Sequence, residues 1–331
     1  LVISKSNEVF LKIDTEPHIE YELRDHFTFE VEGAKFMPQY RNRNWNGEIH
    51  LYDMRSKKIY VGLLPYIKEF CSRNSIEYIM EKGVENDRNV LRESVRDFAE
   101  SLRPKSRGKL IQFRDYQIDA IWYAIQSNRC LLLSPTASGK SLIIYTLVRY
   151  YNLMKLKTLI LVPTTSLVEQ MYSDFIDYGW NDKYIHRIYS GHERTTDKPV
   201  IVSTWQSLYK MPKKYFENFG CVLGDEAHLF KAVSLTKILT KLEKCPYKIG
   251  MTGTLDGSKT HKLVLEGLFG AVNKVVSTSE LIEREQLAEL KIMCLVLQHD
   301  QTARHFLKDK TYQEEMDFLV SNEKRNKYIR N

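Results

Sequence analysis

The sequence predicts an α/β protein, in which a small α+β domain precedes a parallel sheet with helices on both faces. Two observations indicate this class. From residue 110 onward, short apolar runs alternate with amphipathic segments, which is typical of βα units in a mostly parallel sheet. Before that point, residues 103–109 combine Pro, Gly and Ser with basic residues, which is typical of a domain boundary. The 331 residues suffice for about two domains.

Residues 1–103 are expected to form the small α+β domain. Alternation over residues 9–13 predicts a strand, and the spacing of Leu23, His26 and Phe27 predicts a short helix within 19–29. The pair Asn46-Gly47 is a strong tight-turn signal, and the alternating residues 48–52 after it predict a hairpin. Amphipathic helices are expected over 63–71 and 88–102.

Residues 104–109 are expected to be a linker, and residues 110–285 to form the domain built on the parallel sheet. Its strands are expected at 131–133, 158–162, 185–189, 200–203, 222–223 and 248–251. Its helices are expected at 116–127, 141–151, 166–178, 205–211, 235–242 and 262–268. Residues 286–331 are expected to begin a second domain of this kind, with a strand at 290–297 and a charged helix at 312–329.

The bulk composition is that of an ordinary globular protein, with 43% hydrophobic and 27% charged residues. No run of 18 apolar residues and no secretory leader is found, so we expect a cytoplasmic protein that does not bind membranes. The net charge is +7, and residues 1–108 contribute nothing to it because they carry 18 basic and 18 acidic side chains. The surplus on the sheet domain is compatible with a polyanionic partner. The five cysteines include no Cys-x-x-Cys pair and suggest no zinc site.

The most informative segment is residues 134–141, which read Ser-Pro-Thr-Ala-Ser-Gly-Lys-Ser directly after the apolar run 130–133. A strand that ends in a Gly-Lys-Ser turn and opens a helix directs free backbone N–H groups at phosphate. Lys140 would then contact the β- and γ-phosphates of ATP, and the Ser141 hydroxyl would ligate Mg²⁺. Ser134 stands where the general phosphate-loop pattern has Gly. Alone, such a segment is as readily a plain turn before a helix.

A second motif, Asp225-Glu226-Ala227-His228, follows the apolar run 221–223. Asp225 would hold the Mg²⁺, and Glu226 would orient the attacking water. Alone, the two acids are also what the first turn of a helix favours. Because both motifs occur in this order, each at the end of a predicted strand, an ATP site is the favoured interpretation.

Four further motifs occupy the same part of the chain. They are Phe113-Arg114-Asp115-Tyr116-Gln117, Pro163-Thr164-Thr165-Ser166-Leu167-Val168-Glu169-Gln170, Ser203-Thr204-Trp205-Gln206-Ser207-Leu208 and Met251-Thr252-Gly253-Thr254. Together with the two motifs above, this ordered set resembles the first motor domain of superfamily 2 helicases and translocases, over about residues 110–275. Taken singly, Thr165 or Ser166 is as readily a helix N-cap, and residues 252–254 an ordinary turn.

The resemblance implies a RecA-like domain that binds ATP with Mg²⁺. Gln117, with Arg114 beside it, corresponds to the motif that reads adenine, and a Gln amide suits that edge because it donates and accepts at once. The coupling of ATP state to strand movement is expected at His228, Thr252 and Thr254. The nucleic-acid backbone is expected at Pro163, Thr164, Thr165 and Thr204. The nucleotide-binding loop comprises Pro135, Thr136, Ala137, Ser138, Gly139, Lys140 and Ser141.

The resemblance narrows to the phage branch-migration DNA helicases of the UvsW type, which process recombination and fork intermediates. It rests on residues 41–49, 104–109, 134–141, 310–315 and 324–327. Two positions depart from the pattern: Ala137 stands where most superfamily members have Gly, and His228 differs from some relatives.

The aromatic and basic residues of the N-terminal part allow two interpretations. Arg41, Arg43 and Trp45 would grip a duplex or stack on an unpaired base, as the resemblance implies. The alternative is a hairpin with a half-buried Trp45 and solvated arginines. The zero net charge of residues 1–108 argues against a strong binding site.

We therefore expect an ATP-dependent DNA helicase or translocase that acts on branched or forked DNA, with recombination or replication proteins as further partners. An RNA helicase, or the duplex translocase subunit of a restriction or remodelling complex, would use the same motifs. In a different class, a nucleic-acid-binding module would use ATP only as a switch, but such a module needs no water-positioning Glu226. An unrelated kinase would leave Gln117, Thr204 and Thr252 without a role.

Superfamily 2 motors place ATP between two RecA-like domains, and the second domain supplies arginine fingers worth roughly 10³–10⁵ in rate in comparable phosphoryl transfers. No Gln-x-x-Gly-Arg-x-x-Arg pattern is found in this sequence. We therefore expect the chain to be the N-terminal part of a longer protein and to hydrolyse ATP poorly alone.

Overall fold

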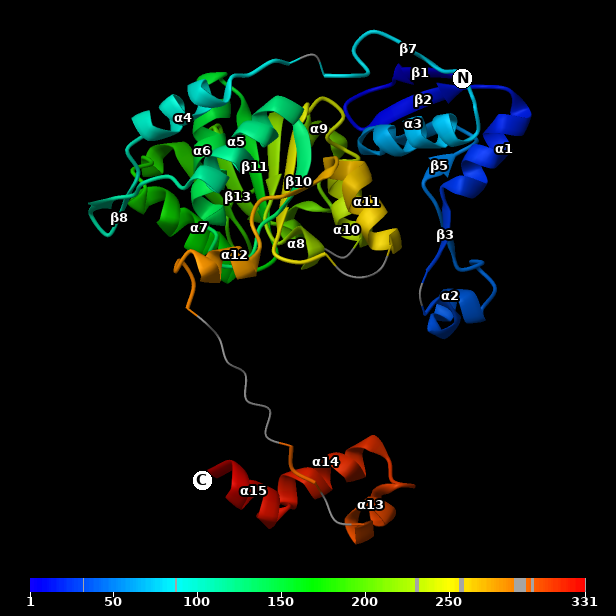
Figure 1. The fold of residues 1–331 in the computed structure, drawn as a ribbon, viewed down its shortest axis with the longest axis vertical. Helices are drawn as coiled ribbons and strands as arrows, with labels where there is room; N and C mark the ends of the chain where they lie inside the picture. The colour runs from blue at the N-terminus through cyan, green and yellow to red at the C-terminus, as the bar shows by residue number, and fades with distance from the viewer. Residues whose placement is uncertain are drawn as a thin grey trace. The chain divides into compact units, whose positions relative to one another are not determined.

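A seven-stranded parallel sheet is the largest sheet that the described residues form. The computed structural model describes residues 1–31, 33–86, 88–229, 232–255, 259–288, 296–298 and 301–330, which divide into two compact units, Leu1–Leu287 and Ala288–Asn331. The sheet belongs to the larger unit, in which Figure 1 labels its strands β10, β11 and β13, and its strand order is β12-β13-β11-β14-β15-β10-β16. Its strands are β10 (Arg129–Leu133), β11 (Lys157–Val162), β12 (Ile185–Ile188), β13 (Val200–Thr204), β14 (Phe219–Gly224), β15 (Tyr247–Thr252) and β16 (Val272–Lys274).

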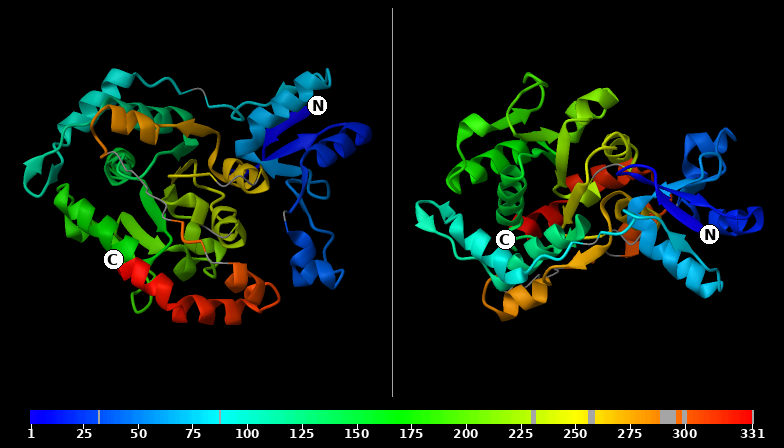
Figure 2. Two further views of the ribbon diagram at one scale, coloured as in Figure 1. Left: turned by 60° about the horizontal axis from the view of Figure 1, so that its bottom comes forward. Right: turned by 90° about the horizontal axis from the view of Figure 1, so that it is seen from above.

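The apolar runs form this sheet because both of its faces are covered. Along β10, Leu131 packs into one core and Leu132 into another, and along β11 Leu159 and Ile160 alternate in the same way. One core is completed by α5 (Asp115–Ser127), α6 (Lys140–Leu153) and α7 (Thr165–Asp177). The other is completed by α8 (Trp205–Leu208), α9 (Lys213–Phe216), α10 (Ala232–Leu239) and α11 (Lys259–Phe269). Figure 2 shows the helices on the two faces, which confirms the predicted fold class.

The six strands predicted for this domain are all present, with ends that differ by up to three residues. The seventh strand, β16, escaped prediction because it has three residues and none of them is fully buried. After β16 the chain continues into α12 (Thr278–Glu283), a helix that begins with a capping box at Ser277.

The N-terminal part is a mixed five-stranded sheet of order β5-β6-β2-β1-β7, covered by α1 (Pro17–His26) and α3 (Leu64–Arg73). Its buried residues, Leu11 and Ile67 among them, join the same core as α11 of the parallel sheet domain. The predicted α+β character is therefore confirmed. The strands are β1 (Val2–Lys5), β2 (Phe10–Asp14), β5 (Tyr52–Asp53), β6 (Lys58–Tyr60) and β7 (Ile79–Met80).

The predicted hairpin around Asn46-Gly47 is only partly right. Gly47 does adopt a positive φ of 88°, and a strand, β4 (Glu48–His50), follows it. The partner of β4, however, is β3 (Thr28–Glu30), so the chain between the two strands is long rather than a tight turn. Within that connection lies α2 (Pro38–Arg41), which starts at a proline, a residue that suits the first turn of a helix.

Glu8 fixes the mixed sheet to the base of the parallel sheet. Its backbone N–H donates to the Glu243 carbonyl at 3.0 Å, and its own carbonyl accepts from Lys248 Nζ at 2.7 Å and from Arg129 Nη2 at 3.0 Å. Arg129 and Lys248 are paired neighbours at the start of β10 and β15. Lys248 is 1% exposed, and burial together with the positive charge of Arg129 lowers its pKa to about 7.

A second contact joins the N-terminal part to α11. The Tyr66 hydroxyl donates to the Glu266 carboxylate at 2.6 Å. Gly62 lies so close to α11 that an added Cβ would come within 1.9 Å of the Glu266 carbonyl oxygen. Glycine is needed at position 62 because any side chain would push the two parts of the larger unit apart.

The predicted linker is a small antiparallel pair, β8 (Lys105–Ser106) and β9 (Lys109–Leu110). Its turn places Arg107 and Gly108 at φ values of 50° and 78°. The preceding helix, α4 (Arg92–Ser101), lies within the range predicted as 88–102; it buries Val95, while Phe98 is half-buried. Whether this segment separates two domains stays a prediction, as do the other predicted domain boundaries.

The smaller unit contains α13 (Gln301–Leu307), α14 (Tyr312–Ser321) and α15 (Glu323–Arg330). The single helix predicted over 312–329 is wrong, because Asn322 leaves the helical region with φ −69° and ψ 103° and separates α14 from α15. The side chain of Asn322 accepts from the Arg325 N–H, as an N-cap does. The strand predicted at 290–297 falls mostly outside the described residues. Within the described part of the chain, no helix combines the length and apolarity that a bilayer crossing requires.

Candidate nucleotide-binding site

Three of the predicted motifs meet at one edge of the parallel sheet. They follow β14, β15 and β10, which are neighbours, and the carboxyl ends of parallel strands lie at the same edge. The loop after β10 is tied to the one after β15 by a hydrogen bond from the Ser134 N–H to the Thr252 carbonyl, at 2.8 Å. Gly253 lies over this loop, since a Cβ added there would be 3.8 Å from Lys140 Nζ.

The loop over residues 134–139 is held by its own serines. The Ser134 and Ser138 hydroxyls are 2.6 Å apart, and Ser138 Oγ also donates to the Pro135 carbonyl at 2.7 Å. Both serines are fully buried, so Ser134, which departs from the general pattern, has a structural role in this chain. Ala137 adopts a φ of 67°, which costs a non-glycine residue on the order of 1 kcal/mol. A glycine would adopt this φ without that strain, which agrees with the expectation that most superfamily members have Gly at this position.

A chain of polar contacts crosses the three loops. Lys140 Nζ donates to the Glu226 carboxylate, and the other carboxylate oxygen is 3.5 Å from His228 Nδ1. His228 Nδ1 is 2.6 Å from the Thr252 hydroxyl, which itself donates to the Thr254 carbonyl at 2.6 Å. Because that hydroxyl has one proton to give, Nδ1 of His228 must be the donor in their contact. The structure thus brings together the residues predicted for phosphate, water and coupling.

Asp225 lies at the end of β14, with only 6% of its surface exposed. Its carboxylate accepts from the Glu226 N–H at 3.0 Å. Burial raises the pKa of Asp225 to about 6, although the positive charge of Lys140 opposes the rise. A buried carboxylate that is costly to ionise is suited to receive a cation.

Ser141 is not paired with Asp225 in this structure. Burial raises the pKa of Asp174, on α7, and a hydrogen bond from Ser141 opposes that rise. The same hydroxyl also opposes the rise that burial causes in the pKa of Tyr178. The predicted role of the Ser141 hydroxyl as a metal ligand stays a proposal.

Gln117 contacts the nucleotide loop directly. Its amide nitrogen donates to the Ser138 carbonyl at 2.9 Å, and its amide oxygen accepts from the Arg114 N–H at 3.0 Å. Gln117 is 4% exposed. Its neighbour Tyr116, which the sequence interpretation gave no role, also donates to the Ser138 carbonyl, at 3.1 Å. The only signal for Tyr116 in the sequence is its position beside Gln117.

The loops predicted to contact nucleic acid lie at the ends of β11 and β13. Thr164 caps α7, since its hydroxyl accepts from the Leu167 N–H at 3.3 Å, so neither Thr165 nor Ser166 is the N-cap. Thr204 is 5% exposed and its hydroxyl is 2.8 Å from that of Ser207. A hydrogen bond of 3.0 Å from the Gln206 amide to the Pro163 carbonyl ties the two loops together. The roles of Pro163, Thr164, Thr165 and Thr204 toward nucleic acid stay predictions.

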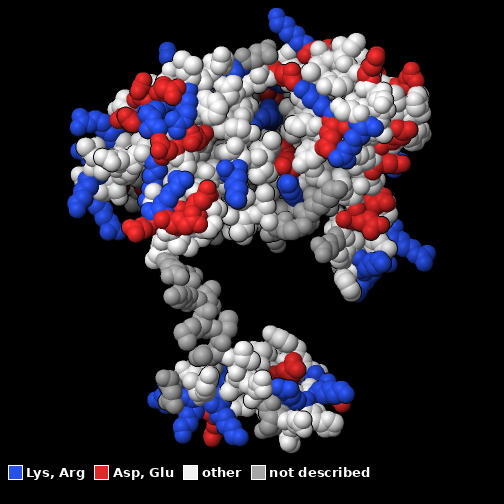
Figure 3. Space-filling view, viewed as in Figure 1, with Lys and Arg blue, Asp and Glu red and all other residues white. Residues whose placement is uncertain are grey.

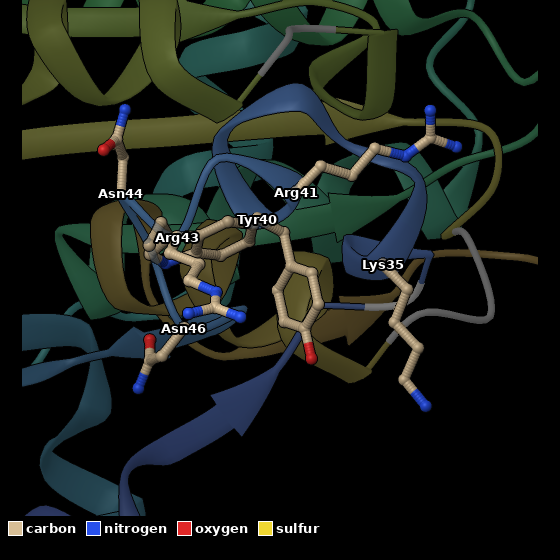
Figure 4. Close-up of a pocket in the computed structure, with 7 residues that line it drawn as sticks. Lys35, Tyr40, Arg41, Arg43, Asn44 and Asn46 are labelled. Carbon is tan, nitrogen blue, oxygen red and sulfur yellow. The ribbon is translucent and has the colours of Figure 1, made fainter.

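The aromatic and basic segment after β3 lines a cavity of about 710 Å³. Figure 4 shows the Tyr40 ring at its centre, with Lys35 and Arg41 on one side and Asn44 and Asn46 on the other. Trp45 is half-buried and donates from Nε1 to the Glu48 carbonyl at 2.7 Å.

Arg41 and Arg43 are exposed, so this segment has the features of both interpretations. Figure 3 shows basic and acidic side chains interspersed over the visible face of Leu1–Leu287, without one dominant sign.

Two families match separate parts of the chain. Residues 110–257 match the family described as Type III restriction enzyme, res subunit, and residues 6–81 match the family described as DNA helicase UvsW, N-terminal. The chain is 37% identical over 325 residues to the ATP-dependent DNA helicase uvsW of Enterobacteria phage T4, a match that covers 96% of this chain. It spans 64% of the length of that relative.

Solved structures give the same result. The crystal structure of the UvsW helicase from bacteriophage T4 superimposes with a TM-score of 0.76 at 34% identity, covering 82% of this chain and 99% of that one. A second T4 UvsW structure covers 99% of this chain with a TM-score of 0.77. A more distant relative, the DNA 3'-5' translocase XPB2 of Sulfurisphaera tokodaii, is 30% identical over 192 residues, which are 56% of this chain and 38% of that protein.

Proposed function

This chain belongs to the UvsW family of superfamily 2 helicases, and from that premise we propose that it is part of an ATP-dependent DNA helicase or translocase. The observation that carries the proposal is the line of contacts from Lys140 through Glu226 and His228 to Thr252. It joins the phosphate, water-positioning and coupling residues at one edge of the sheet.

The residues at this edge fit a nucleotide with a divalent cation. Gly139 opens α6 at a φ of 84°, and a Cβ there would come 2.3 Å from Gln117 Nε2, so the loop has room only for backbone. Free N–H groups at such a helix start bind phosphate. Asp225 and Ser141 would hold Mg²⁺, which neutralises charge on the phosphates when bound.

ATP binding would change the partner of Lys140. Its ammonium would move from the Glu226 carboxylate to the β- and γ-phosphates, since the phosphates carry more charge. The freed carboxylate of Glu226 would then accept a proton from, and orient, the water that attacks the γ-phosphate. His228 contacts both Glu226 and Thr252, so the change of partner at Lys140 would be transmitted to the loop after β15.

The substrate we propose is branched or forked DNA, processed during recombination, repair or replication in the cytoplasm. The UvsW family supports it, and the surplus of basic residues after position 108 is compatible with it. Thr164, Thr204 and the exposed arginines Arg41 and Arg43 are the residues we propose to contact the DNA. Other recombination or replication proteins are the further partners proposed.

A second candidate is the duplex translocase subunit of a restriction complex. The match of residues 110–257 to the Type III restriction subunit favours it, because the motor domain alone does not distinguish the two. That candidate does not account for residues 6–81, which match the UvsW N-terminal family.

The test is the ATPase rate of the full-length protein with no nucleic acid, single-stranded DNA, linear duplex, RNA and a four-way DNA junction. Strong stimulation by the junction supports the proposal. Stimulation by linear duplex alone favours the restriction-type translocase, and stimulation by RNA alone overturns the DNA assignment. The variant Glu226→Gln is the control for contaminating ATPase.

A further inference from the structure

The carbonyl of Ser138 accepts two hydrogen bonds from the first turn of α5. One comes from Gln117 Nε2 at 2.9 Å and the other from the Tyr116 hydroxyl at 3.1 Å. Ser138 is fully buried and Tyr116 is 5% exposed, so both bonds are shielded from water. A buried carbonyl with two donors is held in a fixed direction.

The direction of this carbonyl decides where the next N–H points. In a planar trans peptide the C=O and the following N–H point to opposite sides. With the Ser138 carbonyl turned toward α5, the Gly139 N–H is turned away from α5. That N–H is one of the free donors at the start of α6, where phosphate binds.

Tyr116 has a second set of contacts. Its hydroxyl accepts from Arg114 Nη1 at 2.7 Å, and its ring packs in a small cluster with Val276 and Leu281. These two residues belong to the segment that leaves the parallel sheet after β16 and runs through α12. Tyr116 therefore touches both the nucleotide loop and the segment that leads out of this domain.

We propose that Tyr116 is a positioning residue for the phosphates of the nucleotide, acting through the Ser138–Gly139 peptide, and that its ring links this loop to the segment around α12. The inference deepens the proposed ATPase and rests on it. Gln117 shares the Ser138 carbonyl and is the residue predicted to read adenine, whereas the Tyr116 hydroxyl has no predicted contact with the base.

The chain offers a matched control for removing this hydroxyl. Tyr145 is also a buried tyrosine whose hydroxyl accepts from an arginine, Arg149 Nη1 at 3.0 Å, and bonds a backbone carbonyl, that of Tyr178 at 3.2 Å. Its hydrogen-bond partners lie on α6 and after α7 and do not include the Ser138–Gly139 peptide. Tyr116→Phe and Tyr145→Phe thus remove the same atom and the same kind of hydrogen bonds.

The experiment compares both variants with the wild-type full-length protein in DNA-stimulated ATPase assays, with inorganic tripolyphosphate as a competitor. Tyr116→Phe is expected to raise the KM for ATP and the inhibition constant of tripolyphosphate by the same factor, roughly 2- to 10-fold, as the loss of one neutral hydrogen bond predicts. Its kcat and melting temperature should match those of Tyr145→Phe, and Tyr145→Phe should leave both constants unchanged.

Three outcomes would overturn the inference. An unchanged KM in Tyr116→Phe would show that the hydroxyl has no positioning role. Equal shifts of KM in the two variants would show that loss of the hydroxyl affects only general stability. A rise in KM for ATP without a rise for tripolyphosphate places the effect on the base. If the wild-type protein binds neither ATP nor tripolyphosphate, the proposed ATPase itself is wrong. This result is distinct from the three outcomes above.

Discussion

The ammonium of Lys140 and the carboxylate of Glu226 form an ion pair between the loops that follow β10 and β14. One residue is the predicted phosphate ligand and the other the predicted water-positioning acid. While they are paired, neither is available for its proposed task. In the proposed ATPase, binding of ATP and activation of water would therefore be linked, because the first would have to release the carboxylate for the second.

Replacing Glu226 by Gln should separate nucleotide binding from hydrolysis. The amide keeps the shape of the side chain but holds Lys140 less strongly, so ATP should bind at least as tightly as in the wild type. Hydrolysis should fall by roughly 10²–10⁴-fold, the range expected for loss of a general base. Fluorescent-nucleotide titration and single-turnover assays measure the two quantities. Normal hydrolysis by this variant would remove Glu226 from its assigned role.

Replacing Lys140 by Ala should weaken ATP binding by at least about tenfold, since a charge-assisted hydrogen bond to phosphate is worth roughly 1.5–3 kcal/mol. ATPase activity should be lost with it. Lys12, an exposed lysine on β2, provides the control, and Lys12→Ala should bind ATP like the wild type. Comparable affinity in Lys140→Ala and Lys12→Ala would contradict the assignment of the nucleotide loop.

The raised pKa of Asp225, about 6, predicts how Mg²⁺-dependent ATP binding responds to pH. A cation competes with the proton for this carboxylate, so affinity should be flat above pH 6 and fall by up to about tenfold per pH unit below it. Calorimetric titration across pH 5–8, with and without Mg²⁺, measures the effect. Asp225→Asn should abolish the Mg²⁺-dependent part at every pH. A decline already complete above pH 7 would show that another group is responsible.

The same carboxylate should cost stability at neutral pH. Its pKa is higher in the folded protein than the ordinary 3.8, so folding favours the protonated form, and the protein loses stability as pH rises through 6. Asp225→Asn resembles the protonated form and should raise the free energy of unfolding at pH 7 by about 1–3 kcal/mol. Urea denaturation checks this, and a less stable variant would contradict the burial argument.

Lys248 should give the opposite pH dependence. Its pKa is lowered from 10.5 to about 7, so the unfolded chain binds more protons between these values and stability should rise with pH across that window, by up to about 1.4 kcal/mol per pH unit. Lys248→Met keeps the length of the side chain without the charge. Its advantage in unfolding free energy over the wild type should be largest near pH 7 and shrink toward pH 10. A difference that is constant with pH would mean that Lys248 is buried without a change in pKa.

The strands of the parallel sheet could be predicted because burial on both faces leaves continuous apolar runs such as 158–162. β16 could not, because its three residues take their place from pairing with β10 rather than from their own hydrophobicity. The pairing of β4 with β3 could not be predicted either. The Asn46-Gly47 turn is a local signal, whereas pairing with β3 depends on a connection whose residues form a helix.

At the candidate site, the motifs identified the residues but not their present partners. Sequence spacing predicts that Lys140 and Glu226 share a site, but their ion pair depends on how two loops meet in the absence of a nucleotide. Ser141 also interacts with Asp174, a residue that no motif contains. Tyr116 contacts the backbone carbonyl of Ser138. Every residue type has a backbone carbonyl, so the sequence does not indicate this contact.

The hydrogen bonds at Glu8 require the N-terminal part and the parallel sheet domain to match each other. Arg129 and Lys248 lie at the base of the two strands whose other ends lead into the nucleotide loops, and both donate to the same backbone carbonyl of the N-terminal part. A motor domain acquired by genetic exchange without a matching N-terminal segment would leave these two cations without that acceptor. We would therefore expect recombinant genes that survive to carry both segments from one parent.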